Sequence, residues 1–442
     1  MRFKRKWLSI PILICLSSQS AMSDNWSQWM GDERDGEWRE AGIVDSFPAD
    51  GLPVKWRVPL SYGYGGPAVV DGKVFVMDYQ VAQGNVVNTP DGAVKLSGQE
   101  RVVCFATESG AKIWEHAYEQ PYKLSYPGGP RCTPTIHKGK VYALGAEGTL
   151  VCLTADKGAV VWRVSLPQRY KTTTSIWGYT SHPLVEGDLV YTLAGGPGSV
   201  CVALNRHTGE EVWSALSADE QGYNAPTMIT HGGKRQLLIW TPRALNSLDP
   251  ATGDVYWSVP LQPGFNMSIM APRKEGNYLY ASAIGNASAL IELNSAQPGA
   301  KIVWRGKPKT SIYCSNSTPI IDNGMIYGCD IETGTLMCAR LEDGKRLWQT
   351  TKPTDNSKRR SRHATAFLVK HEDRYFLFNE LGDLILAKLS PEGYQEVSRF
   401  HVLEPTNEAF GRPVVWSHPA FAEKSIFARN DKELVRVDLA RP

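Results

Sequence analysis

Short alternations of apolar and polar residues recur along this chain, and turn-forming residues separate them. The segment PIIDNGMIYGCDIETGTLMCARLEDGKRLWQ, from Pro319 to Gln349, shows the pattern clearly, with one Gly turn after Asn323 and another after Asp343. Asn-Gly or Asp-Gly between β-branched and aromatic runs favours a hairpin, because both central residues of that turn adopt positive φ readily. The segment therefore predicts four short antiparallel strands.

The same pattern recurs throughout the chain. First halves similar to PAVVDGKVFVMD begin at Pro67, Pro134 and Pro183, and second halves such as SLDPATGDVYW end in a tryptophan. One tryptophan marks each unit, and Phe400 occupies the equivalent position in the unit after them. Successive tryptophans are 44 to 58 residues apart: Trp56, Trp114, Trp162, Trp213, Trp257, Trp304 and Trp348. Four-stranded repeats of about 40 to 50 residues are typical of a β-propeller.

The two ends of the repeat region complete each other. PAFAEKSIFARNDKELVRVDLA, from Pro419, supplies three strands without a fourth, whereas LPVKWRVPL, from Leu52 to Leu60, is a single strand with none before it. Pairing them forms an eighth unit and removes exposed sheet edges. We therefore predict an all-β fold over residues 52–442: an eight-bladed β-propeller of four-stranded antiparallel blades, closed by pairing of the N- and C-terminal strands.

Composition agrees with one large β domain and restricts the classes of partner. Of 442 residues, 42% are hydrophobic and 40 are glycine, as a turn-rich chain requires, and no long helical period interrupts the repeats. The formal net charge is +3, with 21% charged residues. We therefore expect no nucleic-acid partner and no strong attraction to anionic lipid. We also expect a monomer.

The first residues differ from the repeats. MRFKRK is basic, WLSIPILICLSS is apolar but too short to span a bilayer, and AMS before Asp24 has the small residues of a cleavage site. We predict a signal peptide at 1–23, an N-terminal extension at 24–51, and export to the periplasm or the extracellular space, with no transmembrane segment in the mature chain. Cys15 leaves a lipoprotein anchor as an alternative, although Ile14 stands where that pattern expects a small residue.

Seven cysteines follow the predicted signal peptide, and several occupy a repeated position. Cys201 lies two residues before that position in its own unit, hence on the same strand face, and we interpret the group as small buried strand residues. Cys314 and Cys329 flank one hairpin, so a disulfide between them is the alternative to two free thiols. Three cysteines lie six residues before the glycine of the second turn: Cys104, Cys152 and Cys338.

The repeat A-x-D/T-x-x-T-G-x-x-x-W, seen best in SLDPATGDVYW from Ser247, resembles the pyrroloquinoline-quinone-like (PQQ-like) repeat of eight-bladed propellers. That superfamily includes quinoprotein alcohol dehydrogenases and the propeller lipoprotein of the outer-membrane barrel-assembly machine. WSQWMGDERDG at Trp26 and WSHPAFAEKSIFARNDKELVRVDLA at Trp416 are also similar to exported repeat propellers of planctomycete-like bacteria. The resemblance covers nearly the whole mature chain and implies the fold. It implies no activity, because the repeat is structural.

By the same resemblance, quinoprotein dehydrogenases hold their cofactor with a disulfide between adjacent cysteines, a calcium ion ligated by Glu and Asn, and an Asp base. This chain has no Cys-Cys dipeptide, so we predict no cofactor, no metal ion and no catalytic residue. Ser-elbow, H-E-x-x-H, P-loop and G-x-G-x-x-G motifs are absent too. Another chemistry is left open. The alternative is a quinoprotein-type dehydrogenase with PQQ and calcium in the central channel.

A functional site is expected where the connections before the innermost strands converge on the central channel, because convergent polar groups in a concavity favour binding. The loops between second and third strands emerge on the same side, which we term the upper face. Polar and aromatic residues at or beside these positions are the candidates for binding a ligand or partner: Tyr64, Arg131, Trp177, Tyr179, His182, Asn224, Asn316, Arg362, His363, Glu380, Trp416 and His418.

Three features are open to two interpretations each. The Ser-His-Pro sequences of His182 and His418 would place two imidazoles near one metal ion or anion, or form turns whose histidines hydrogen-bond to neighbouring loops. KRRSR, residues 358–362, is either an anion-binding patch or a solvated loop. The insertion at 79–99 is either a recognition loop or an additional hairpin.

Two functions from different classes follow. The first is an exported, non-enzymatic β-propeller that binds a protein, peptide or glycan partner through its upper face. The alternative is a quinoprotein-like oxidoreductase with a cofactor in the central channel. A visible-absorbing cofactor or cofactor-dependent dye reduction distinguishes them, because only the oxidoreductase requires either.

Overall fold

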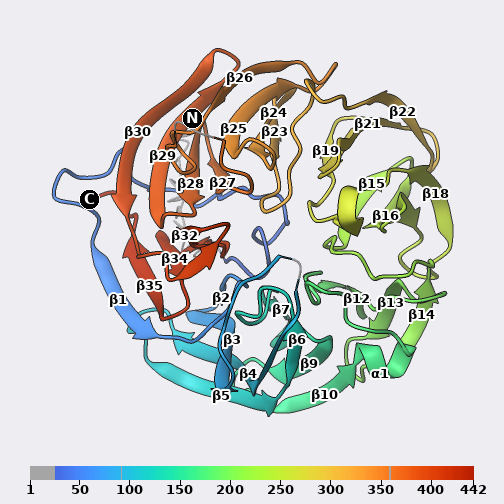
Figure 1. The fold of residues 1–442 in the computed structure, drawn as a ribbon, viewed down its shortest axis with the longest axis horizontal. Coiled ribbons are helices and arrows are strands. Elements are labelled where there is room, and N and C mark those ends of the chain that lie inside the picture. The colour runs from blue at the N-terminus through green and yellow to red at the C-terminus, as the bar shows by residue number, and fades with distance from the viewer. Residues whose placement is uncertain (1–24, 91, 358–359) are drawn as a thin grey trace, which may run out of the picture.

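Eight antiparallel sheets surround a central axis in the computed structural model, which describes residues 25–90, 92–357 and 360–442 (Figure 1). The chain passes around the ring in order, and the predicted eight-bladed propeller is confirmed. The predicted signal peptide at 1–23, including Cys15, lies outside the described residues. No helix within the described ranges is long and apolar enough to cross a membrane.

Within the first seven blades, strands follow one another in chain order from the channel to the outer surface. Blade one contains β2 (Ala68–Val70), β3 (Lys73–Gln83), β4 (Val94–Ala106) and β5 (Lys112–Glu119), and blade two contains β7 (Thr135–His137), β8 (Lys140–Leu144), β9 (Thr149–Thr154) and β10 (Val160–Ser165). Blade three contains β11 (Leu184–Glu186), β12 (Leu189–Leu193), β13 (Cys201–Asn205) and β14 (Glu211–Ala215). Blade four contains β15 (Thr227–His231), β16 (Lys234–Trp240), β17 (Ala244–Leu248) and β18 (Val255–Pro260).

The remaining blades follow the same scheme. Blades five to seven are β19 (Arg273–Glu275), β20 (Tyr278–Ala283), β21 (Ala287–Leu293), β22 (Ala300–Arg305); β23 (Ile320–Asp322), β24 (Met325–Asp330), β25 (Thr335–Arg340), β26 (Arg346–Thr350); and β27 (Ala366–His371), β28 (Arg374–Asn379), β29 (Asp383–Ser390), β30 (Gly393–His401). The eighth is β33 (Ala420–Ala422), β34 (Ser425–Arg429), β35 (Glu433–Asp438) and β1 (Val54–Pro59). The connections contain β6 (Tyr122–Leu124), helix α1 (Leu166–Tyr170), the 3-10 helix η1 (Gly264–Asn266), and the hairpin of β31 (Asn407–Ala409) and β32 (Arg412–Val414).

The eighth blade is completed by the two ends of the repeat region, as predicted. β1 pairs antiparallel with β35, from Val54 opposite Val437 to Pro59 opposite Glu433. In Figure 1 the blue strand β1 lies beside the red strand β35. This pairing closes the ring, so neither strand presents a free edge at the junction.

The repeated tryptophan of each outer strand packs against the following blade. In β14, Trp213 is 7% exposed, and its indole N–H donates to the Pro250 carbonyl of the next blade at 3.0 Å. Its ring covers Gly253, where an added Cβ would lie 2.6 Å from an indole carbon. A β-bulge lies just before each repeated tryptophan and changes the direction of the tryptophan side chain. The same contact with a turn glycine is made by Trp56, Trp114, Trp162 and Trp304.

Cysteines lie opposite three of these tryptophans. Cys104, Cys152 and Cys338 are each the direct cross-strand partner of the tryptophan in their own blade. All cysteines in the described part of the chain are buried and free. The predicted role in strand packing is confirmed, and the disulfide alternative for Cys314 and Cys329 is not formed.

The insertion at 79–99 forms a hairpin that extends β3 and β4 beyond the length of the other blades. β6 pairs with the start of β4, so the hairpin has a partner strand and the first sheet gains a fifth strand. At the tip, the Asn88 side chain donates to the Glu408 carbonyl at 2.7 Å. The insertion therefore reaches the connection between the seventh and eighth blades.

The N-terminal extension crosses the face opposite the upper face and ties distant blades together. The amide of Trp26 donates to the Val69 carbonyl in the first blade at 2.8 Å. The amide of Trp38 donates to the Lys370 carbonyl in the seventh blade, also at 2.8 Å. Between these two tryptophans, the Arg34 guanidinium donates to the carbonyls of His182 and Pro226, which precede the third and fourth blades, so the segment reaches across the ring.

Candidate functional site

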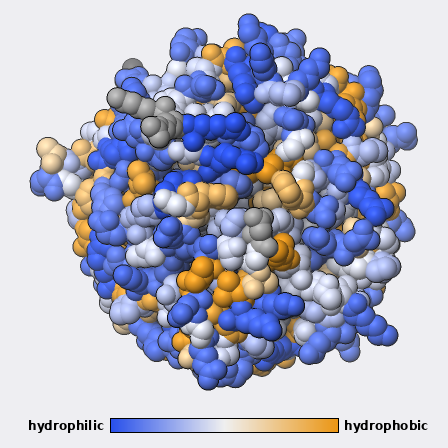
Figure 2. Space-filling view, in the orientation of Figure 1, coloured by the Kyte–Doolittle hydropathy of each residue, from blue (hydrophilic) through white to orange (hydrophobic). Residues whose placement is uncertain are grey.

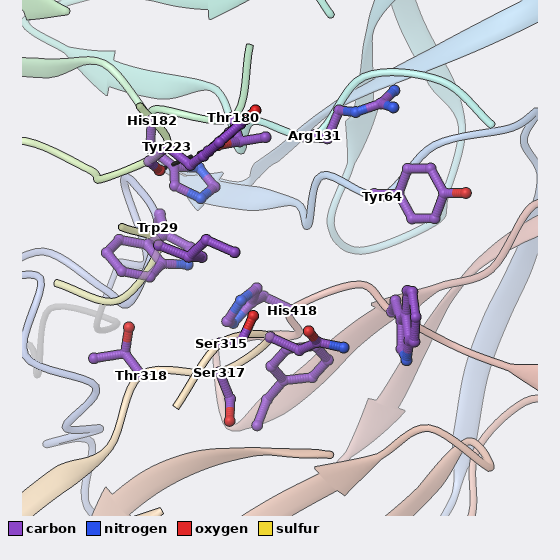
Figure 3. Close-up of a pocket in the computed structure, with 14 residues that line it drawn as sticks. Trp29, Tyr64, Arg131, Thr180, His182, Tyr223, Ser315, Ser317, Thr318 and His418 are labelled. Carbon is purple, nitrogen blue, oxygen red and sulfur yellow. Dashed lines mark hydrogen bonds between the residues drawn. The ribbon is translucent and has the colours of Figure 1, made fainter. Parts of the chain in front are cut away.

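A cavity of about 180 Å³ occupies the central channel on its upper side. Figure 3 shows its lining residues around one open space, most of them on loops that precede the innermost strands. These loops come from positions far apart in the sequence, so only the closed ring brings them together. Half of the predicted candidates line the cavity: Tyr64, Arg131, His182, Asn316, Trp416 and His418.

The floor of the cavity is Trp29 of the N-terminal extension. Its indole stacks on the His182 imidazole, with centroids 4.7 Å apart and planes 6° apart. It meets the His418 imidazole edge-on at 5.8 Å. This residue is not among the predicted candidates, because the extension has no strand pattern. The available signal was a second tryptophan three residues after Trp26, ahead of the first strand.

His182 and His418 approach Trp29 from the third and eighth blades. The Thr133 amide donates to His182 Nδ1 at 2.9 Å, so in the neutral ring Nε2 carries the proton. Burial lowers the pKa of His182 well below its ordinary value, and burial lowers the pKa of His418 to about 3. Both rings are therefore neutral near pH 7. For His182 the predicted bond to a neighbouring loop is confirmed.

Replacing His418 with glutamine should reduce the acid sensitivity of the fold. The folded-state pKa of His418 is about 3, whereas the unfolded chain titrates at about 6.5. As the pH falls, the unfolded state takes up the proton first, so stability is lost from pH 6.5 down to about 3. Between pH 7 and pH 5 we expect wild type to lose about 2 kcal/mol more than His418→Gln, measured by urea unfolding.

The control for this experiment is Val212→Ala, because the Val212 side chain is 51% exposed and does not titrate. Its loss of stability between pH 7 and pH 5 should follow that of wild type. If wild type and His418→Gln lose stability equally over this interval, His418 is not held neutral in the folded protein.

Arg131 holds the connection at the rim of the cavity. Its guanidinium lies over the Tyr64 ring, 5.3 Å from the ring centroid. Its hydrogen-bond partners are all neutral, and within the described residues no ion pair joins it to a carboxylate. The guanidinium donates to four backbone carbonyls, those of Ser125, Tyr126, Gly129 and Trp177.

Aromatic side chains gather beside the cavity on the upper face. His363 stacks on Phe410 with centroids 4.6 Å apart, and Phe410 lies 6.2 Å from Trp416. Phe410 is 48% exposed at the turn of the β31–β32 hairpin. Trp416 also lines the cavity, so the two features are continuous. We term this group the rim cluster, made of Tyr126, His363, Phe410 and Trp416.

Glu380 supports the rim cluster from within. Arg412 Nε donates to one carboxylate oxygen at 2.6 Å, and Trp416 Nε1 donates to the other at 3.1 Å. Burial raises the pKa of Glu380 in spite of these donors. Phe410 and His363 have φ of 51° and 64°, which is uncommon for bulky residues. For Phe410 this is the geometry of a two-residue hairpin turn with Gly411, as at Asp71 and Gly72 in the first blade.

Two predicted candidates are buried in the ring, where their side chains bond to backbone carbonyls. Tyr179 is buried, and its hydroxyl donates to the Ala194 carbonyl at 3.0 Å. Asn224 is also buried, and its amide donates to the Met270 carbonyl of the next blade at 3.0 Å. Neither side chain is available to a partner on the upper face.

Two further candidates lie on the upper face but outside the cavity. Trp177 is half-buried and packs edge-on against Tyr223, with centroids 5.8 Å apart. Arg362, in the KRRSR segment, is exposed and pairs with Glu332 at 3.2 Å. They border the cavity without forming its wall.

The chain matches a protein-family model and resembles solved structures. The family model described as outer membrane protein assembly factor BamB, a PQQ-like repeat model, matches residues 98–350, more than half of the chain. The chain belongs to this PQQ-like propeller family. No curated protein sequence matches it.

Two solved structures share the fold of this PQQ-like propeller. BamB from Moraxella catarrhalis is 14% identical, with a TM-score of 0.57, and the match covers 88% of this chain and 97% of that one. Quinohemoprotein alcohol dehydrogenase from Comamonas testosteroni is 13% identical, with a TM-score of 0.58, over 95% of this chain and 81% of that one. Identities this low establish a common fold and no shared activity.

The cavity of this PQQ-like propeller does not match a calcium-bound quinone. Its lining contains no carboxylate, whereas calcium is bound mainly by carboxylate and carbonyl oxygens. Within the described ranges, no group of three His, Cys, Asp or Glu side chains could hold a metal ion. Trp29 also fills the channel below, which leaves only about 180 Å³ above it. The residues present therefore do not fit that cofactor.

Proposed function

We propose that this PQQ-like propeller is an exported, non-enzymatic binding protein that holds a protein, peptide or glycan partner on its upper face. The rim cluster is the observation that carries the proposal. Phe410 exposes 48% of its surface at the tip of a hairpin that the ordinary blades do not contain. The family description, which names an assembly factor of the outer membrane, and the signal-like sequence at 1–23 support a role outside the cytoplasm.

The rim cluster has the physical properties of a binding hot spot. Aromatic residues dominate binding energies when they are rigid and surrounded by groups that exclude water. Here Trp416 is fixed by its bond to the buried Glu380 carboxylate, and Phe410 is stacked on His363. Little side-chain entropy would be lost on binding, because the rings are already ordered. Figure 2 shows hydrophobic residues around the middle of a largely hydrophilic face.

Replacing Phe410 and Trp416 together with alanine should weaken partner capture at least about tenfold, because each ring is a candidate hot spot. The measurement is quantitative pull-down of cross-linked partners from the exported fraction of the source cells. Lys157→Ala with Glu210→Ala is the matched control, because both residues are exposed in lower-face turns. Equal loss of capture in both double variants would place the binding surface elsewhere.

A further inference from the structure

The cavity has an unusual charge balance for a site in the centre of a protein. Arg131 is the one charged side chain in its lining, and its described partners are neutral carbonyls. Beneath the floor, Arg34 is buried and also donates to carbonyls, among them those of His182 and Pro226. Burial lowers the pKa of Arg34 to about 9, so it stays protonated at pH 7. The nearby Glu380 is paired with Arg412. Arg131 therefore gives the cavity wall a positive charge that no carboxylate in the lining offsets.

Two hydrogen-bond donors in the lining have no acceptor among the described residues. Trp29 Nε1 and the Ser315 hydroxyl are both buried and unbonded, in side chains that are 4% and 2% exposed. In Figure 3 the nitrogen edge of Trp29 is turned toward His418. An indole N–H is a donor only, and leaving a buried donor unpaired costs about 1 to 3 kcal/mol. Both atoms are shielded from solvent, so an acceptor that enters the cavity reaches them only when the side chains that cover them shift.

Other donors point to the same kind of ligand. His182 carries its proton on Nε2, because Nδ1 accepts the Thr133 amide. Asn316 and hydroxyl groups add further polar atoms to the wall. Hydrogen bonds from such donors to an ionised acceptor are roughly twice as strong as neutral ones. A wall with one positive charge and several donors is complementary to an anion that offers several lone pairs.

The size and the walls of the cavity restrict that anion. A volume of about 180 Å³ is far below the roughly 300 to 1,000 Å³ of pockets for drug-sized ligands. The walls include the rings of Tyr64, Tyr223, Phe367 and Trp416 above the Trp29 floor. Aromatic walls favour an apolar or aromatic body next to the charge.

We propose that the central cavity binds one carboxylate group carried on an apolar or aromatic body about the size of a single amino-acid side chain. This deepens the proposed function, on which it rests, by naming the chemistry that the partner presents. The carboxylate would belong either to the last residue of a partner chain or to a free small acid. A chain ending in the cavity would pass over the rim cluster, because Trp416 belongs to both.

The test is calorimetric titration of the mature protein with N-acetyl-phenylalanine and with its neutral amide. The acid should bind at least about tenfold more tightly, because only the acid carries the charge that Arg131 and the donors recognise. A peptide of several residues that ends in phenylalanine distinguishes a chain end from a free small acid. It is titrated as the free acid and as the amide. If Phe410→Ala weakens the free-acid peptide but not N-acetyl-phenylalanine, the ligand is a chain end. If the free-acid peptide binds wild type and Phe410→Ala with equal affinity, the ligand is a free small acid.

A charge placed in the wall provides the matched variant. Asn316→Asp keeps the shape of the side chain and adds a negative charge, so acid binding should fall at least about tenfold. Asn294→Asp adds the same charge in an exposed turn outside the cavity lining, so acid binding should change less than about threefold. The proposal is overturned if neither probe binds, if acid and amide bind equally, or if both variants bind the acid alike. Partner capture through the rim cluster is measured in a separate experiment. A negative result for the carboxylate site therefore leaves the proposed binding at the rim cluster intact.

Discussion

Trp213→Ala should lower the free energy of unfolding by about 3 to 5 kcal/mol, the range for truncating a large buried aromatic. The indole is 7% exposed, bonds to the Pro250 carbonyl of the next blade, and covers Gly253. Removal therefore leaves a cavity between two blades, and the Pro250 carbonyl keeps only its bond from the Tyr191 hydroxyl. Equilibrium urea unfolding followed by circular dichroism measures the effect, because it does not depend on tryptophan fluorescence.

The control for this change is Val212→Ala in the same strand. Val212 lies beside Trp213 in the sequence, but its side chain is 51% exposed, so we expect a loss below about 1 kcal/mol. Gly253→Ala tests the same contact from the other blade, since the new Cβ would meet the indole at 2.6 Å and φ is +81°. A loss below about 1 kcal/mol for Trp213→Ala would mean that the tryptophans do not join the blades.

Deleting residues 52–60 should abolish cooperative folding, a loss of more than about 5 kcal/mol that exceeds the reserve of many domains. The deletion removes β1, which supplies the outer strand of the eighth blade. It also removes Trp56, whose indole N–H donates to the Thr107 carbonyl in the first blade at 2.6 Å. The edge of β35 and the junction between the first and last blades would both be exposed. Thermal unfolding and protection of amides from exchange report the outcome.

A double substitution in β1 separates loss of the strand from loss of its side chains. Val54→Ala with Lys55→Ala keeps the backbone pairing with β35, and Val54 is 41% exposed. We expect this variant to unfold within about 1 kcal/mol of wild type. A deletion protein that unfolds as cooperatively as the double variant would show that the ring does not depend on closure by β1.

Much of the architecture could be predicted because its signals are local and repeated. A turn glycine and a tryptophan at fixed spacing identify a four-stranded unit, and eight such units leave one arrangement of the chain ends that pairs β1 with β35. The strand-packing role of Cys104 followed from its position in the repeat, and it lies opposite Trp114. The upper-face positions were predicted because the strand order determines where each connection emerges. Half of the candidates chosen on that basis line the cavity.

The tertiary structure decided what the site is made of, because its contacts join residues without any shared sequence pattern. Trp29 lies in an extension that forms no blade, yet it stacks on His182 and contacts His418. Tyr179 has the same kind of sequence position as the cavity residues, but its hydroxyl turns inward to a carbonyl. Whether such a side chain faces the channel or the blade interface depends on loop geometry that periodicity does not encode. The amino-acid pattern alone determined the ring and its closure, whereas long-range packing of irregular segments determined the cavity, its floor and its charge.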